Sequence, residues 1–111
     1  MKAGDVVLCE FVQVNDFKAR PALILKIVPP YDDFLVCAIS TQLQNQVEGV
    51  DEIIEIKDAD FTRTGLKATS LVRVTMVQTL MREEIFGKMG EISPRRLERI
   101  CRNLARFIES E

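Results

Sequence analysis

Two short apolar runs, the first of them bounded by prolines, constrain the fold of this chain more than any other feature. The first run, residues 23–28, is interrupted only by Lys26 and ends at Pro29-Pro30, because proline cannot donate to a strand ladder. Residues 31–33 then turn the chain, and residues 34–39 form the second run. Continuous apolar runs of this length are typical of strands that are covered on both faces. The sequence therefore predicts a buried β-structure.

Further strands are expected before and after this pair. The segments with strand character are residues 6–12, 51–56, 71–77 and 88–92. Polar or turn-forming stretches separate them, namely residues 14–19, 41–46 and 58–65. Regular alternation is weak in residues 71–77, so the register of that strand stays open.

The C-terminal segment has the strongest helical pattern. Ser93 is suited to cap the helix, and Pro94 follows at the first helical position, where its missing N–H costs nothing. Apolar residues then recur at helical spacing and form one stripe: Leu97, Ile100, Leu104 and Phe107 or Ile108. Arginines form a second face: Arg95, Arg99, Arg102 and Arg106. This face is either a solvated surface or a contact for nucleic acid or an acidic partner.

Several short strands followed by one amphipathic helix predict a mainly β fold, a small antiparallel barrel or sheet capped by the C-terminal helix. The length of 111 residues fits one domain over residues 1–111. No apolar stretch approaches the roughly 20 residues of a membrane span, and the first residues lack signal-peptide organisation. We therefore expect a cytoplasmic protein that does not enter a membrane.

Composition limits the chemistry. The net charge of −2 gives no overall signature of a nucleic-acid binder. There is no histidine, which excludes Ser-His and Cys-His triads and removes the usual zinc ligands. The three cysteines, Cys9, Cys37 and Cys101, are predicted to be buried free thiols. Any catalysis must use arginine, lysine, carboxylates, hydroxyls or Tyr31, and we expect no cofactor.

Arg20, directly before Pro21 and the first apolar run, is the leading candidate for an anion-binding residue. Proline disfavours helical geometry at the preceding residue, so Arg20 is predicted to be extended and held at a defined angle. A guanidinium suits phosphate because it forms directed, paired hydrogen bonds. Ser40 and Thr41 end the second run, and Arg73 interrupts a later strand, where it must reach solvent or an anion.

Five fragments carry a resemblance to a known family. They are, in chain order, GDVVLCEF, ARPALIL, CAISTQ, TGLKATSLVRV and GKMGEISPRRLERICRNL. Each is generic by itself, but the ordered set resembles the MazF/PemK family of toxin–antitoxin ribonucleases. The resemblance implies SH3-like antiparallel β-barrels of the MazF/PemK/CcdB type that form a homodimer. It also implies cleavage of single-stranded RNA without a metal, by attack of the ribose 2′-hydroxyl on the adjacent phosphate.

The resemblance also implies roles for individual residues. Arg20 stands at the family's RP motif and would stabilise phosphate charge, and Ser40 would hydrogen-bond the phosphate or orient the nucleophile. Arg73 matches an arginine that serves as general acid or phosphate clamp. Four further residues are expected to contact RNA: Lys18, Thr41, Gln42 and Thr75.

Two departures from the family affect proton transfer. The family's GxEQxG-like loop is replaced by VNDFKA, in which Asp16 is the only carboxylate and thus the substitute candidate for the general base. Thr75 and Met76 occupy the places of an acidic residue and a glutamine. Losing a general base lowers a rate by roughly 10²–10⁴. If Asp16 is not the base, Glu10 and Glu48 are the next candidates.

Three functions remain open at this point. The first is an endoribonuclease toxin neutralised by an antitoxin with an acidic tail. The second is a catalytically weakened relative that still binds nucleic acid or antitoxin, with operator DNA as a further partner in transcriptional autoregulation. The third is a CcdB-like topoisomerase inhibitor. The amides of residues 42–46 are either base-reading groups or part of a solvated loop.

Overall fold

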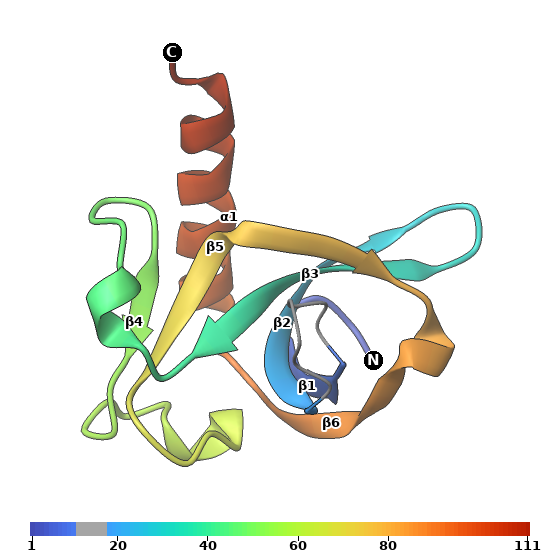
Figure 1. Cartoon of the computed structure of the whole chain (residues 1–111), viewed down its shortest axis with the longest axis horizontal. Helices are drawn as coiled ribbons and strands as arrows, with labels where there is room; N and C mark the ends of the chain where they lie inside the picture. Colours follow the sequence, from blue (N-terminus) through green and yellow to red (C-terminus); the bar gives the residue numbers. More distant parts are fainter. Residues whose placement is uncertain (11–17) are drawn as a thin grey trace.

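The computed structural model describes residues 1–10 and 18–111, which form a six-stranded antiparallel sheet and a C-terminal helix (Figure 1). The strands are β1 (Asp5–Cys9), β2 (Arg20–Val28), β3 (Asp33–Ser40), β4 (Glu52–Ile54), β5 (Ser70–Leu80) and β6 (Ile85–Glu91). Three short 3₁₀ helices, η1 (Leu43–Asn45), η2 (Thr62–Thr64) and η3 (Arg82–Glu84), connect strands, and α1 (Pro94–Glu109) ends the fold. All six predicted strands and the helix are therefore present, with shifted ends.

The sheet is open, so the expected antiparallel sheet with a C-terminal helix is confirmed and the expected barrel is not. Its order is β4-β5-β3-β2-β1-β6, and in the described part of the chain β4 and β6 do not pair with each other. The sheet nevertheless curves strongly, because β1–β6 pairing contains two register shifts and β2–β3 and β3–β5 pairing contain one each. Such bulges bend and twist a sheet without closing it.

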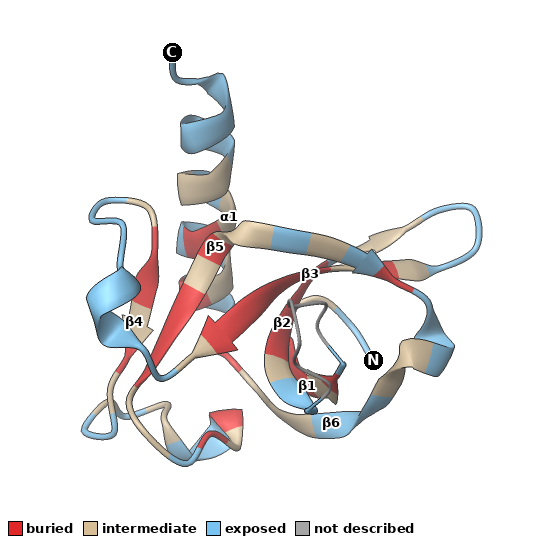
Figure 2. Cartoon of the chain, in the orientation of Figure 1, coloured by how far each residue is buried: buried red, intermediate tan, exposed pale blue. Residues whose placement is uncertain are grey.

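The central strands are covered on both faces, as the apolar runs predicted (Figure 2). Consecutive residues of one strand contribute to different clusters of the core, because side chains alternate across a strand. Val6 and Leu23 lie with Ile100 of α1 in one cluster, whereas Val7 and Ile24 lie in a second cluster. The second cluster also contains Phe34, Val36 and Leu80.

Strand β5 bends sharply in its middle (Figure 1). Cys37 pairs with Val77, but the next residue of β3, Ala38, pairs with Arg73, so residues 74–76 have no partner on β3. The buried carboxylate of Asp51 stabilises the bend by accepting a hydrogen bond from the Val74 N–H at 3.0 Å. The other Asp51 oxygen accepts from the Val47 N–H at 2.9 Å. Asp51 thereby joins the loop before β4 to the bent strand.

Helix α1 begins as its sequence predicts. The Ser93 hydroxyl accepts a hydrogen bond from the Arg96 N–H at 3.2 Å, and Pro94 is the first helical residue. The apolar stripe is shorter than expected. Leu97, Ile100 and Leu104 pack on the core, whereas Phe107 is 47% exposed and Ile108 is 71% exposed. The last turn extends beyond the sheet (Figure 1), which agrees with the exposure of these two side chains.

Arg96 is buried, unlike the other arginines of α1. Its guanidinium donates two hydrogen bonds of 2.9 Å to Asp60, one of 3.0 Å to Glu52 of β4 and one of 3.2 Å to Asp58. Arg99 donates to the same Glu52 carboxylate. This ion-pair network fixes α1 to β4 and to the segment before η2.

The cysteines are free thiols, with Cys9 and Cys37 buried and Cys101 half-buried. Burial raises the pKa of Cys9 to about 11, with a smaller contribution from the Glu84 charge, so this thiol stays protonated near neutral pH. Among the described residues, no helix combines the length and apolar character that crossing a membrane requires.

Candidate functional site

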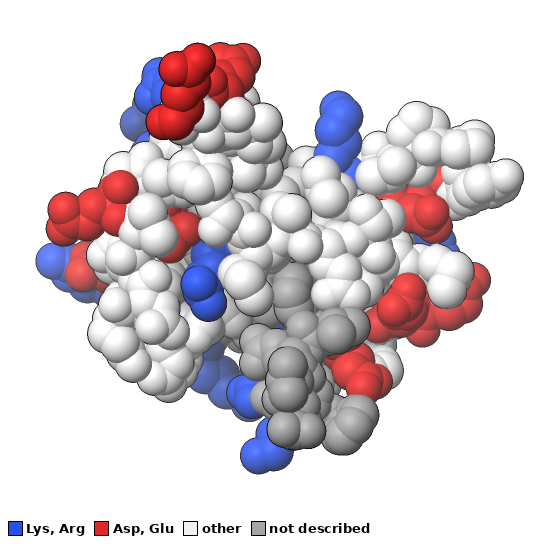
Figure 3. All heavy atoms as spheres, turned by 45° about the horizontal axis from the view of Figure 1, so that its top comes forward, with Lys and Arg blue, Asp and Glu red and all other residues white. Residues whose placement is uncertain are grey.

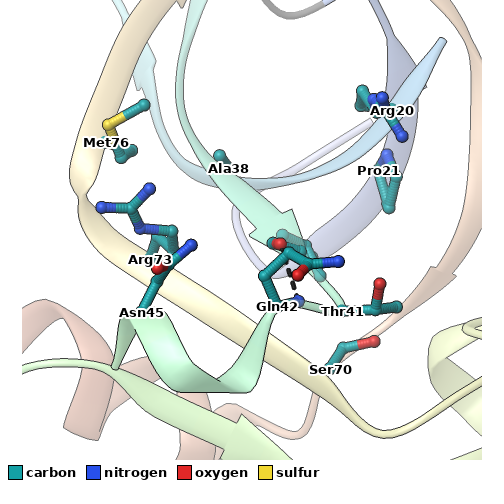
Figure 4. Close-up of a pocket in the computed structure, with 11 residues that line it drawn as sticks. Arg20, Pro21, Ala38, Thr41, Gln42, Asn45, Ser70, Arg73 and Met76 are labelled. Atoms are coloured by element: carbon teal, nitrogen blue, oxygen red, sulfur yellow. Dashed lines mark hydrogen bonds between the residues drawn. The ribbon is translucent and has the colours of Figure 1, made fainter. Parts of the chain in front are cut away.

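A pocket of about 380 Å³ opens where β2 begins and β3 ends. Its lining comes from β2, β3, η1 and both sides of the bend in β5 (Figure 4). The lining residues are Arg20, Pro21, Ala38, Ile39, Ser40, Thr41, Gln42, Asn45, Ser70, Arg73 and Met76. The pocket therefore brings together Arg20, Ser40 and Arg73, which lie far apart in the sequence.

Arg20 is the first residue of β2 and pairs with Cys9 of β1. This placement confirms the extended backbone that Pro21 predicts for it. Pro21 pairs only with Leu8, because pairing between β2 and β3 starts at Ala22, so its missing N–H removes no hydrogen bond to β3. In Figure 4, Arg20 and Pro21 lie across the pocket from Arg73.

Ser40 is the last residue of β3 and is half-buried. Its Oγ accepts a hydrogen bond from the Gln42 N–H at 3.0 Å, shown as a dashed line in Figure 4. A hydroxyl oxygen that accepts from the backbone can still donate its own proton. Ser40 is thus held in a fixed position with its O–H group available for an acceptor in the pocket.

Arg73 reaches the pocket because it is the last β5 residue that pairs with β3 before the bend. Its Nε is buried and has no hydrogen-bond partner among the described residues. A buried donor without an acceptor costs about 1–3 kcal/mol. Because the Nε is enclosed, an anion in the pocket would bind the other guanidinium nitrogens of Arg73, and a phosphate oxygen has the geometry that a guanidinium recognises.

The remaining predicted residues divide into three groups. Thr41 and Gln42 line the pocket, as expected for ligand contacts. Lys18 is exposed and Thr75 is half-buried, and neither is part of the lining. Asp16 lies outside the described residues.

No described lining residue is a carboxylate. Glu10 and Glu48 are exposed and do not line the pocket either. The described part of the pocket can therefore bind and stabilise negative charge, but it does not include a strong proton acceptor. Asp16 therefore stays the predicted general base.

Six lining residues were not predicted as site residues: Pro21, Ala38, Ile39, Asn45, Ser70 and Met76. Asn45 belongs to the loop of residues 42–46. The sequence left the amides of this loop open as base-reading groups or part of a solvated loop. Ser70 directly precedes the expected strand of residues 71–77 and extends it by one position. Met76 enters the lining through the bend in β5, and no sequence pattern predicted that bend.

The arginine face of α1 forms a separate hollow. It is lined by Arg95, Glu98, Arg99, Arg102, Asn103 and Arg106. Two of these arginines already have acidic partners, because Arg102 contacts Glu98 at 2.6 Å and Arg99 contacts Glu52. Figure 3 shows a face of the molecule whose centre is mostly uncharged, with acidic and basic side chains mainly at its margins.

Sequence comparison identifies the family that matches this chain. Residues 2–108 match the family described as "PemK-like, MazF-like toxin of type II toxin-antitoxin system". No curated protein sequence matches the chain.

Solved structures with the same fold cover nearly the whole chain. One is an endoribonuclease in complex with its cognate antitoxin from a mycobacterial species, with 19% identity, a TM-score of 0.70 and coverage of 100% of this chain and 97% of that one. Another is the Mycobacterium tuberculosis toxin MazF-mt6, with 16% identity, a TM-score of 0.71 and coverage of 96% and 98%. A third is an endoribonuclease from a mycobacterial species, with 20% identity, a TM-score of 0.71 and coverage of 97% and 90%. At these identities, the similarity establishes the fold.

Proposed function

Because this chain belongs to the PemK-like, MazF-like toxin family of type II toxin–antitoxin systems, we propose that it is an endoribonuclease that cleaves single-stranded RNA. The observation that carries the proposal is the pocket in which Arg20, Ser40 and Arg73 meet. Two guanidinium groups and a donating hydroxyl around one cavity suit a phosphodiester. The similarity in fold to two proteins named as endoribonucleases supports the same conclusion.

In the proposed reaction, the ribose 2′-oxygen attacks the adjacent phosphorus and the bond from phosphorus to the 5′-oxygen breaks. The products are a 2′,3′-cyclic phosphate and a 5′-hydroxyl end. Negative charge grows on the phosphoryl oxygens during the attack, and preformed donors aimed at that charge lower the barrier. Arg20 and Arg73 supply this stabilisation from opposite sides of the pocket, and the Ser40 O–H donates to a phosphoryl oxygen.

The reaction moves two protons. The 2′-hydroxyl proton passes to a base, for which we propose Asp16, four residues before Arg20 in the chain. A second proton goes to the leaving 5′-oxygen. We propose that Arg73 either donates this proton or stabilises the charge on the leaving oxygen. Thr75 cannot replace a carboxylate as base near neutral pH. The proposed chemistry uses no metal, since arginine side chains hold the charge that a metal would otherwise hold.

The absence of a carboxylate from the described lining favours one second candidate function. In that case the chain binds RNA or an antitoxin but cleaves slowly. The topoisomerase-inhibitor hypothesis gains no support from the family match. As partners we propose a cognate antitoxin, as in the mycobacterial complex, together with a homodimeric assembly and operator DNA bound with the antitoxin.

The test is digestion of end-labelled single-stranded RNA in excess EDTA, followed by analysis of the product ends. We expect cyclic phosphate and 5′-hydroxyl ends. Arg20→Ala should lower the cleavage rate by about 10²–10³-fold, the usual effect of removing one charge-stabilising donor. Arg95→Ala removes an exposed arginine of α1 outside the pocket and is the matched control.

Equal cleavage by Arg20→Ala and Arg95→Ala would remove Arg20 from the site. Strong RNA binding without products would establish the second candidate function in place of the first. Products with a 3′-hydroxyl end would contradict attack by the 2′-oxygen.

A further inference from the structure

The loop that follows Ser40 places two amide side chains, Gln42 and Asn45, in the pocket lining. A third amide, Gln44, lies outside the lining but contacts Gln42: its Nε2 donates to the Gln42 Oε1 at 2.8 Å. The Gln42 backbone N–H donates to the Ser40 Oγ at 3.0 Å. Gln42 is therefore tied at its backbone to the proposed phosphate-binding group and at its amide oxygen to Gln44.

These two contacts give the Gln42 amide a direction. A primary amide has one accepting oxygen and an NH₂ group with two donating hydrogens. The oxygen is engaged by Gln44, whereas the NH₂ group makes no recorded hydrogen bond within residues 1–10 and 18–111. In Figure 4, Gln42 lies between Arg73 on one side and Thr41 and Pro21 on the other. The side chain thus offers the pocket a donor.

A donor aimed at the 6-position of a purine or the 4-position of a pyrimidine separates the nucleobases into two classes. Guanine and uracil carry an accepting carbonyl oxygen, O6 or O4, where adenine and cytosine carry a donating amino group, N6 or N4. A glutamine with both ends available pairs well with adenine, because it accepts from N6 and donates to N7. The Gln42 oxygen keeps a second lone pair, but it is turned toward Gln44, which lies outside the lining, so the amide nitrogen is the end offered to the base.

We propose that Gln42 reads the base next to the bound phosphate and selects a carbonyl-bearing base, guanine or uracil, through its amide nitrogen. Gln44 is a positioning residue that fixes the orientation of the Gln42 amide. This inference rests on the proposed function to the extent that the pocket must bind RNA. It does not require that the RNA be cleaved.

Replacing the NH₂ group of the Gln44 side chain by an oxygen tests the orientation of the Gln42 amide directly. Gln44→Glu replaces the donor by an acceptor of nearly the same shape, so the Gln42 amide should rotate to donate to the new carboxylate and present its oxygen to the pocket. The preference should then change from carbonyl-bearing to amino-bearing bases, adenine or cytosine. Gln46→Glu makes the same charge change in the same loop at an exposed residue outside the lining, and serves as the control.

The measurement is selection from a randomised single-stranded pool of 2′-fluoro RNA, which lacks the attacking hydroxyl and cannot be cleaved by it. We expect the parent and Gln46→Glu to enrich a carbonyl-bearing base at one position by about tenfold, which corresponds to the lower part of the discrimination range for one base contact. The base frequencies distinguish guanine from uracil. Gln44→Glu should invert the preference, and Gln42→Ala should abolish it while retaining binding. The loop residues are exposed, and thermal unfolding of each variant verifies folding.

The outcomes distinguish a failure of the base-reading inference from a failure of the proposed catalysis. A parent that shows the preference but makes no RNA products supports the inference and contradicts the proposed catalysis. A parent that cleaves RNA, with a base preference unchanged in Gln44→Glu and Gln42→Ala, overturns the inference alone. Failure of the parent to bind any member of the pool also overturns the inference.

Discussion

Arg73 occupies its position in the pocket at a cost to the stability of the free protein. Its Nε is buried without a partner among the described residues, while its neighbour Val74 is hydrogen-bonded by Asp51. Asp51 fixes the bend in β5 just beyond Arg73, and the bend keeps the guanidinium in the pocket. A buried donor without a partner is typical of functional sites, where stability is lower than the fold would permit.

Because its Nε is unsatisfied, Arg73 is predicted to separate stability from activity when it is replaced in Arg73→Met. The substitution removes the unsatisfied donor and keeps most of the side-chain volume, so the free energy of unfolding should stay unchanged or rise by about 1 kcal/mol. RNA cleavage should fall by about 10²-fold or more, because a charge-stabilising group is lost. Urea denaturation and the RNA digestion assay measure the two effects. Arg106→Met, at an exposed arginine outside the pocket, should change neither. A clear loss of stability in Arg73→Met would contradict the argument.

Site residues could be named from the sequence where one residue type and one local pattern were sufficient. Arg20 was identified by the proline after it, and Ser40 by its position at the end of an apolar run; both line the pocket. Met76 could not be named, because its place depends on three residues of β5 that have no partner on β3. Thr75 was expected near the ligand from its sequence position, but it lies outside the lining for the same reason.

At the scale of elements, α1 is held by a buried ion-pair network as well as by its apolar stripe. The sequence predicted the helix, its capping serine and an arginine face of Arg95, Arg99, Arg102 and Arg106, but it assigned no place to Arg96. Arg96 lies one helical turn before Ile100, a fully buried residue, so helical spacing places it on the side that packs. The acidic partners come from residues 52–60, and the sequence did not indicate that this segment meets the helix.

We expect Arg96→Met to destabilise the protein by about 3–5 kcal/mol, the usual cost of breaking a buried pair, because Glu52 and Asp60 lose the charge that compensates for their burial. Arg95→Met, one residue away and exposed, should change stability by less than about 0.5 kcal/mol. Chemical denaturation of both variants measures the difference. Similar stabilities would show that the network contributes no net stabilisation and that apolar packing alone holds α1.

For the whole molecule, the number of strands follows from local sequence patterns, whereas strand order and curvature depend on contacts between distant residues. Short apolar runs with turn residues between them predicted six strands. Whether the curved sheet closes depends on bulges and on which edge strands meet, and these are long-range properties. β4 has three residues and pairs only with β5 along the recorded ladders, so it leaves the sheet open at this edge. A barrel was therefore a reasonable expectation that local patterns could not test.

The same network that holds α1 makes global stability depend on pH in the acidic range. Hydrogen bonds from Arg96 lower the pKa of Asp60 below its ordinary value of 3.8, against the opposing effect of burial. The folded state therefore binds a proton at Asp60 less readily than the unfolded state. The resulting stabilisation is complete above pH 3.8 and is lost as the pH falls through the lower pKa of the folded protein.

Urea denaturation between pH 7 and pH 2 should show the parent losing stability below about pH 4. In Asp60→Asn the side chain cannot titrate, so its stability should be lower than the parent's at neutral pH and should fall less steeply in acid. A stability difference between the two proteins that stays constant down to pH 2 would show that Arg96 does not act through the Asp60 charge.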